Sequence, residues 1–148
     1  MTHEEKSILI KDLCARLPYE VKCNVGDDKP YTLSRIEVDD KNGHLLDFIE
    51  MKDGLDMQVY LSEVKPYLFP LSSMTEEQKI ECFKGTPLEI DKYGDVAVKD
   101  DFYGNSQYTD IEIYLEVIDW LNKNHFDYRN LPEHLYIKVT EENNPYKE

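Results

Sequence analysis

The most site-like cluster in the sequence lies near its C-terminal end, where several chemically active side chains follow one another. It comprises an indole, an imidazole, a carboxylate, a phenol and a guanidinium, carried by Trp120, His125, Asp127, Tyr128 and Arg129. In one interpretation, His125 is a general base that Asp127 orients, and Arg129 holds an anion. In the other, His125 and Arg129 satisfy the carbonyl groups at a helix C-terminus, while Phe126 and Tyr128 fill the core. Because residues i and i+2 seldom converge on one substrate, the five residues are predicted to be a candidate interaction site and not a catalytic one.

No spacing in the sequence predicts a metal site or a cofactor. Three of the histidines are scattered, without the HxH or HxxxH spacing of a zinc site: His3, His44 and His134. Four aspartates could gather a divalent cation, but they lack the alternating ligands and terminal glutamate of an EF-hand: Asp91, Asp95, Asp100 and Asp101. A solvated acidic loop is the simpler interpretation, so we expect no metal and no cofactor.

The cysteines argue against thiol chemistry and for a reducing compartment. Cys14, Cys23 and Cys82 are an odd number, show no CxxC motif and have no activating histidine beside them. The sequence also has no apolar run long enough to span a bilayer and no signal-peptide core. These features favour a cytoplasmic protein with free thiols.

The net charge of −14 restricts the partners. It excludes binding to nucleic acid by phosphate neutralisation and docking on an anionic membrane. The acidity is concentrated: residues 37–56 carry seven acidic and two basic side chains, and residues 89–119 carry nine and two. If the two segments shared one face, that face could capture a basic protein surface through residues such as Asp39, Asp40, Asp100 and Asp101. A surface that merely maintains solubility is the alternative.

The first half of the chain predicts one helix and four strands. Thr2 and Glu5 form a capping-box pattern that opens a helix, with Leu9, Leu13 and Leu17 as its apolar stripe and Pro18 as its end. The strands are expected over 21–25, 31–38, 44–51 and 57–61, and Asn42-Gly43 is a hairpin signal. We therefore expect an antiparallel meander, with an SH3-like barrel as one possible form.

The segment 65–78 is expected to join the two halves of the chain as an irregular apolar belt. Pro66 and Pro70 argue against a helix or a central strand there, while large apolar side chains require burial. Thr75 and Gln78 form a second capping-box pattern, which predicts a helix over 76–84.

The remaining elements are predicted from spacing. A hairpin is expected between 88–90 and 96–98, a helix over 110–124 and a late strand over 135–139, with a frayed tail from Glu141. The long helix has apolar residues at core-facing spacing: Ile111, Tyr114, Leu115, Ile118 and Leu121. The fold class is α+β, in a single compact domain of 148 residues with two packed subregions, 1–71 and 72–148, as a possible division.

Three blocks of the sequence resemble a known family. They are KDLCARLPY at 11–19, KPYLFPLSSMTEEQ at 65–78 and DWLNKNHFDYR at 119–129. In this order they resemble the signature blocks of a family of short uncharacterised proteins encoded by gut Bacteroidales and by their phages and mobile elements. The resemblance implies a cytoplasmic accessory protein of phage origin, and it assigns no activity to any residue.

Taken together, these observations favour a small acidic protein-interaction module that is not an enzyme. Its partner would be a protein with a basic or neutral surface. One alternative is an anti-defence inhibitor that mimics nucleic-acid charge, and another is a small-molecule-binding protein or enzyme with a deep pocket. A homodimer is a further alternative, in which exposed Tyr67 or Phe69 would form the interface.

Overall fold

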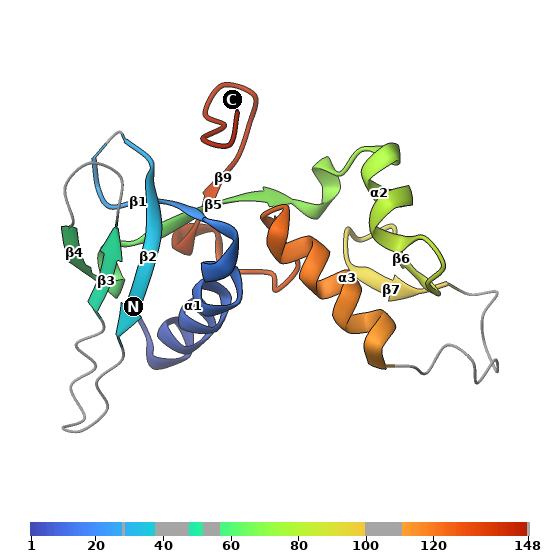
Figure 1. The fold of residues 1–148 in the computed structure, drawn as a ribbon, viewed down its shortest axis with the longest axis horizontal. Helices are drawn as coiled ribbons and strands as arrows, with labels where there is room; N and C mark the ends of the chain where they lie inside the picture. Colours follow the sequence, from blue (N-terminus) through green and yellow to red (C-terminus); the bar gives the residue numbers. More distant parts are fainter. Residues whose placement is uncertain (28, 38–47, 52–56, 100–110, 148) are drawn as a thin grey trace. The chain divides into compact units, whose positions relative to one another are not determined.

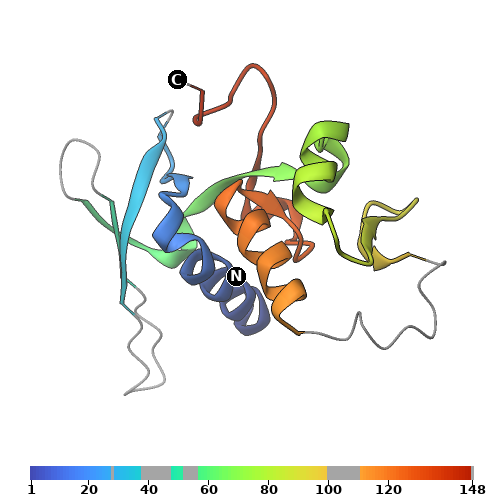
Figure 2. The ribbon, with the colours of Figure 1, turned by 45° about the vertical axis from the view of Figure 1, so that its right-hand side comes forward.

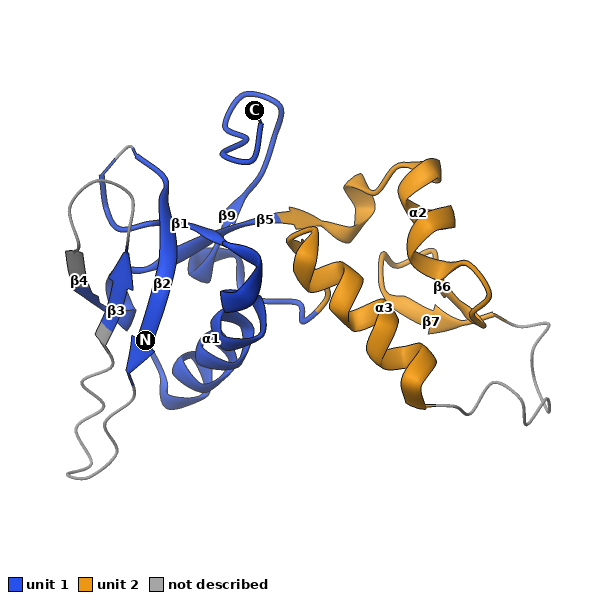
Figure 3. Cartoon of the chain, in the orientation of Figure 1, with its two compact units in different colours: residues 1–68, 129–148 blue, residues 69–128 orange. Residues whose placement is uncertain are grey.

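A computed structural model describes residues 1–27, 29–37, 48–51, 57–99 and 111–147 (Figure 1). Within these residues the chain has the α+β fold that the sequence predicted. The chain forms two compact units, shown in different colours in Figure 3. Unit 1 comprises residues 1–68 and 129–148, and unit 2 comprises residues 69–128. The last twenty residues therefore belong with the first half of the chain, whereas the predicted division at 71/72 placed them with the second. A single domain of 148 residues stays a prediction.

Unit 1 is a sheet with one long helix. Its elements are α1 (His3–Arg16), β1 (Lys22–Asn24), β2 (Tyr31–Glu37), β3 (Phe48–Met51), β4 (Met57–Tyr60), the first part of β5 (Lys65–Pro70) and β9 (Ile137–Lys138). The strand order is β4-β3-β2-β1-β5, with antiparallel neighbours, and β9 pairs with β5 in parallel. The meander of four consecutive antiparallel strands is thus confirmed. The Asn42-Gly43 hairpin signal and His44 lie outside the described residues.

The helix α1 covers one face of this sheet (Figure 2). It begins with the predicted capping box, in which the Thr2 hydroxyl accepts from the Glu5 amide and the Glu5 carboxylate accepts from the Thr2 amide. Leu9 and Leu13 are fully buried against the apolar side chains of β1, β2 and β3, whereas the predicted stripe member Leu17 is only partly buried.

Strand β5 corrects the expectation that two prolines keep this segment out of the middle of a sheet. In unit 1, β5 pairs with β1 through Lys65 and Pro66, and with β9 through Tyr67 and Leu68. Each neighbour pairs with only two residues, so the amide that Pro66 lacks interrupts no long ladder. The predicted burial of the belt is confirmed, because Tyr67, Leu68, Leu71 and Met74 are all buried.

The described part of unit 2 contains two α-helices and a hairpin. Its elements are the end of β5, α2 (Glu76–Phe83), β6 (Leu88–Ile90), β7 (Val96–Val98), α3 (Ile111–Lys123) and β8 (Phe126–Asp127). The second capping box, Thr75 with Gln78, opens α2 as predicted. β6 and β7 form the predicted hairpin, while β8 pairs in parallel with Phe69 and Pro70. The buried core of unit 2 consists of Leu71, Met74, Cys82, Phe83, Leu88, Val117, Leu121 and Phe126.

Two sequence expectations are wrong in detail. The tail beyond Glu141 is not frayed at Tyr146, because its hydroxyl donates to the Tyr67 carbonyl (2.8 Å) and accepts from the Lys22 amide (3.1 Å). The stripe of α3 is also misplaced: Leu121 is 1% exposed, but Ile111 and Leu115 are 69% and 55% exposed. The core-facing side of α3 consists of Val117 and Leu121, with Tyr114 partly buried beside them.

Candidate functional site

The sequence-predicted cluster lies where α3 ends, and its backbone explains part of its composition. His125 follows the helix in a left-handed conformation (φ 62°). Its amide donates to the Asn122 carbonyl (3.2 Å), and its own carbonyl accepts from the Phe69 amide (2.9 Å). His125 therefore occupies the turn that ends the helix and ties it to β5.

The aromatic members of the cluster secure the same helix end. The ring of Trp120 stacks on Phe126 with centroids 5.8 Å apart, and Phe69 packs on Phe126 at 5.4 Å. The Tyr128 hydroxyl donates to Oδ1 of buried Asn122 (3.1 Å). These contacts give Trp120 and Tyr128 a packing role in unit 2.

Arg129 engages a carboxylate of the chain itself. Its Nε lies 3.4 Å from Oδ1 of Asp12, a fully buried residue of α1. Asp12 also accepts from Nε and Nη2 of Arg16 at 2.9 and 3.0 Å, and Arg16 is itself fully buried. Arg129 thus belongs to a buried ionic cluster, which does not support the interpretation in which it holds a substrate anion.

The buried Asp12–Arg16 pair has a signal in the sequence. Asp12 and Arg16 are four residues apart, and they share a helix face with Leu9 and Leu13. Asp127 is also buried, within β8. The four acidic candidates Asp39, Asp40, Asp100 and Asp101 lie outside the described residues.

The outward side of α3 is an apolar surface, although the spacing of its residues predicted that they would face the core. Ile111, Leu115 and Ile118 are spaced i, i+4 and i+7, which places them on one face, and they are 69%, 55% and 39% exposed. We call these three residues the α3 stripe. Glu112, Glu116 and Asp119 are exposed and border it along one side. Periodicity identified the helix but could not tell which apolar face the core would use.

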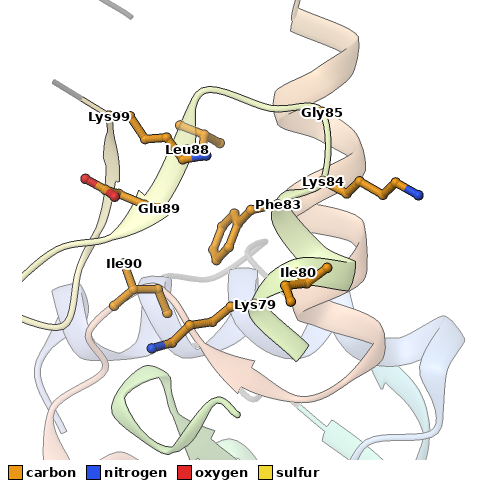
Figure 4. Close-up of a pocket in the computed structure, with 9 residues that line it drawn as sticks. All are labelled: Lys79, Ile80, Phe83, Lys84, Gly85, Leu88, Glu89, Ile90 and Lys99. Atoms are coloured by element: carbon orange, nitrogen blue, oxygen red, sulfur yellow. The ribbon is translucent and has the colours of Figure 1, made fainter. Parts of the chain in front are cut away.

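A pocket of about 440 Å³ lies between α2 and the β6–β7 hairpin (Figure 4). The ring of Phe83 stands in its middle; Leu88 and Lys99 lie on one side of the ring, and Ile90 and Lys79 on the other. The lining also includes Ile80, Lys84, Gly85 and Glu89. No motif in the sequence predicts this pocket, because its walls come from a helix and a hairpin that only the fold brings together.

The cysteines show no sign of activation. Burial raises the pKa of the Cys82 thiol to about 12, and burial also raises the pKa values of Cys14 and Cys23. High pKa values keep all three side chains as neutral thiols at neutral pH. Over the residues that the structure describes, histidine, cysteine and carboxylate side chains form no group of three that could hold a metal ion.

Comparisons with known proteins add no assignment. Within the described part of the chain, no helix is both long enough and apolar enough to cross a membrane. No protein-family model, curated protein or solved structure matches the chain.

Proposed function

We propose that this protein is an interaction module that inserts the α3 stripe into an apolar groove on a partner protein whose border is basic. The observation that carries the proposal is the exposure of Ile111, Leu115 and Ile118 on one face of a helix. Amphipathic helices that dock in grooves use anchors at this i, i+4, i+7 spacing.

The stripe is worth enough free energy to matter for binding. Full burial of an isoleucine or leucine side chain contributes about 1.5–3 kcal/mol. Scaled by the exposed fractions of the three side chains, covering the stripe would contribute on the order of 2–5 kcal/mol. That is a substantial part of a micromolar affinity, which corresponds to about 8 kcal/mol.

The acidic border selects the kind of partner. Glu112, Glu116 and Asp119 lie beside the stripe, so a groove that covers the stripe also meets three carboxylates. A basic border on the partner would complement them, whereas a second copy of this chain would bring a like charge. Charge therefore favours a different protein over a homodimer. The sequence-based homodimer seam has no support from burial, since Tyr67 is buried and Phe69 is partly buried.

The test is capture from a lysate of the source cells with immobilised native and variant protein. We expect Leu115→Lys to reduce the capture of one specific protein about tenfold, because it places a charge in the apolar contact. Tyr93→Lys is the matched control, since Tyr93 is exposed and apolar but lies in the β6–β7 turn. Circular dichroism confirms that both variants are folded.

The dependence of binding on salt concentration distinguishes this proposal from binding by apolar contacts alone. Retention of the captured protein should fall as ionic strength rises towards about 1 M, where the Debye length is about 3 Å. Equal capture by the native and Leu115→Lys proteins, or retention that does not depend on salt, would overturn the proposal.

Two further sequence hypotheses stay predictions. Charge mimicry of nucleic acid required residues 37–56 and 89–119 to share a face, but these segments belong to different units and include residues outside those described. Cytoplasmic location and phage origin are likewise expectations from the sequence.

A further inference from the structure

The C-terminal end of the chain places one side chain between two strands of unit 1. The hydroxyl of Tyr146 accepts from the Lys22 amide of β1 (3.1 Å) and donates to the Tyr67 carbonyl of β5 (2.8 Å). A hydroxyl can do both at once, whereas a backbone amide only donates and a carbonyl only accepts. The phenol of Tyr146 therefore connects β1 and β5 through their backbones.

The register of β1 and β5 shows what this hydroxyl replaces. Cys23 pairs with Pro66, so the next pair along the two antiparallel strands is Lys22 with Tyr67. Hydrogen-bonded pairs alternate with pairs that exchange no hydrogen bonds, and Pro66, which has no amide, fits the second kind. Lys22 and Tyr67 therefore stand where a hydrogen-bonded pair belongs. Since the Tyr146 hydroxyl joins their amide and carbonyl, it takes the place of a ladder hydrogen bond.

The segment that carries Tyr146 is organised mainly by contacts within itself. We call residues 140–147 the C-terminal arm; none of them is a buried residue, and five are exposed. The side chains of Asn143 and Asn144 hydrogen-bond to backbone groups no more than five residues away, at 2.7–3.0 Å. The phenol of Tyr146 is by contrast buried, and this burial raises its pKa above the ordinary range. This one phenol therefore anchors the arm.

The chain immediately before the arm is held more firmly. Leu131, Leu135 and Val139 are buried, and the Val139 amide donates to the Leu68 carbonyl of β5 (2.8 Å). Native proteins open locally, at a lower free energy than global unfolding, where few buried contacts hold a segment. An opening of the arm would thus begin after Val139 and leave β9 paired with β5.

From this geometry we propose that the C-terminal arm is a detachable strap with two states. In the attached state, Tyr146 bridges Lys22 and Tyr67. In the detached state, the phenol leaves and the Lys22 amide donates directly to the Tyr67 carbonyl, so neither backbone group is left without a partner. This direct bond compensates in part for the two hydrogen bonds that are lost. The strap belongs to unit 1, so the inference does not depend on the proposed function of the α3 stripe.

Tyr146→Ala imitates the detached state, because it removes the phenol. We expect this protein to fold and to show a scalar coupling through the new hydrogen bond, between the Lys22 amide nitrogen and the Tyr67 carbonyl carbon. The native protein should lack this coupling, since a hydroxyl separates the two groups. Heteronuclear NMR of the full chain measures it. The coupling between the Leu33 amide and the Val21 carbonyl, which are hydrogen-bonded at 3.0 Å, is the reference in both proteins.

Glu142→Ala is the matched control, because Glu142 is an exposed residue of the same arm and its removal leaves the phenol in place. This variant should resemble the native protein and show no Lys22–Tyr67 coupling. A folded Tyr146→Ala protein that shows the reference coupling but not the Lys22–Tyr67 coupling would overturn the proposal. A Tyr146→Ala protein that does not fold would also overturn it, because the arm would then be an obligatory part of unit 1.

Proteolysis of the native protein tests whether the arm detaches on its own. Chymotrypsin takes the aromatic ring before the cleaved bond into its specificity pocket, so it cuts after Tyr146 only when the phenol has left the two strands. We expect cleavage there, followed by mass spectrometry, to be at least about tenfold faster than cleavage after Tyr67, which is buried within β5. Equal rates at the two sites would show that only global unfolding releases the arm, which would contradict the proposal.

Discussion

The two units of the molecule differ in the side chains that they bury most completely and in those that they expose. Unit 1 buries charge completely, with Asp12 and Arg16 both at 0% exposure. Unit 2 leaves large apolar side chains in water: among the described residues, six of the eight exposed large hydrophobic side chains belong to it, namely Ile80, Tyr93, Val98, Ile111, Leu115 and Ile118. The proposed binding surface, the α3 stripe, thus belongs to the unit with more of the exposed apolar side chains, while the fully buried Asp12 and Arg16 belong to unit 1.

Burying charged and polar groups in unit 1 costs free energy, so each buried group needs a hydrogen-bond or ion-pair partner. Asp12 accepts two hydrogen bonds from Arg16, and a second cation, Arg129, lies 3.4 Å from its carboxylate. The hydroxyl of Tyr146 bridges β1 and β5 close by, and its burial raises the pKa of the phenol above its usual range. Burying these groups without partners would cost several kcal/mol each. The C-terminal segment therefore completes unit 1, which explains why residues 129–148 belong to it.

The largest expected effect comes from breaking this cluster. Asp12→Ala leaves the guanidinium of fully buried Arg16 without its carboxylate, which costs about 3–5 kcal/mol of unfolding free energy. Urea unfolding measures the loss. The control is Glu37→Ala, which removes an exposed partner of Arg35 and should cost less than about 1 kcal/mol. Similar losses in the two variants would show that unit 1 does not depend on the buried ions.

A second prediction compares the two faces of α3 in unit 2. Leu121→Ala removes a side chain that is 1% exposed and should cost about 2–5 kcal/mol. Leu115→Ala, at 55% exposure, should change stability by no more than about 0.5 kcal/mol while weakening partner capture. Thermal or urea unfolding of both variants measures the difference. If Leu115→Ala lowered the free energy of unfolding as much as Leu121→Ala does, the α3 stripe would belong to the core and not to the surface.

The smallest effect concerns Tyr146 and depends on pH. At neutral pH, Tyr146→Phe removes two hydrogen bonds of one hydroxyl and should cost about 1–2 kcal/mol. The folded protein keeps the phenol protonated above its ordinary pKa of 10.0, while the unfolded chain loses that proton. The native contribution is therefore complete below about pH 10 and falls as pH rises further.

Unfolding curves of the native and Tyr146→Phe proteins across this range test the sign. The stability gap between them should shrink as pH rises above about 10. A gap that stays constant or widens would contradict the assigned burial of the hydroxyl.

Local signals predicted local structure well in both units. The capping boxes at Thr2 and Thr75 identified the starts of α1 and α2, and the side chain of Asp91 accepts from the amides of Tyr93 and Asp95 in the predicted hairpin turn. These features depend on residues within a few positions of one another, which a sequence displays directly.

What the sequence did not reveal depends on distant partners. Apolar residues cover more than half of the α3 circumference, so periodicity alone could not separate Val117 and Leu121 from Leu115. Tyr146 looked like part of a frayed tail, because its partners Lys22 and Tyr67 are more than seventy residues away. The pocket could not be predicted for the same reason, since its lining comes from α2 and from the β6–β7 hairpin, which are separate in the sequence.

The contrast between a buried and a solvent-facing side of α3 can be measured directly by thiol labelling. In a Cys14→Ser background, which removes the exposed native cysteine, Leu115→Cys and Leu121→Cys place a thiol on each face of the helix. We predict that the thiol at position 115 reacts with a water-soluble reagent at nearly the rate of an unfolded control, while the thiol at 121 reacts only when the protein unfolds. Equal protection of the two thiols would contradict the account, because the α3 stripe would then be no surface at all.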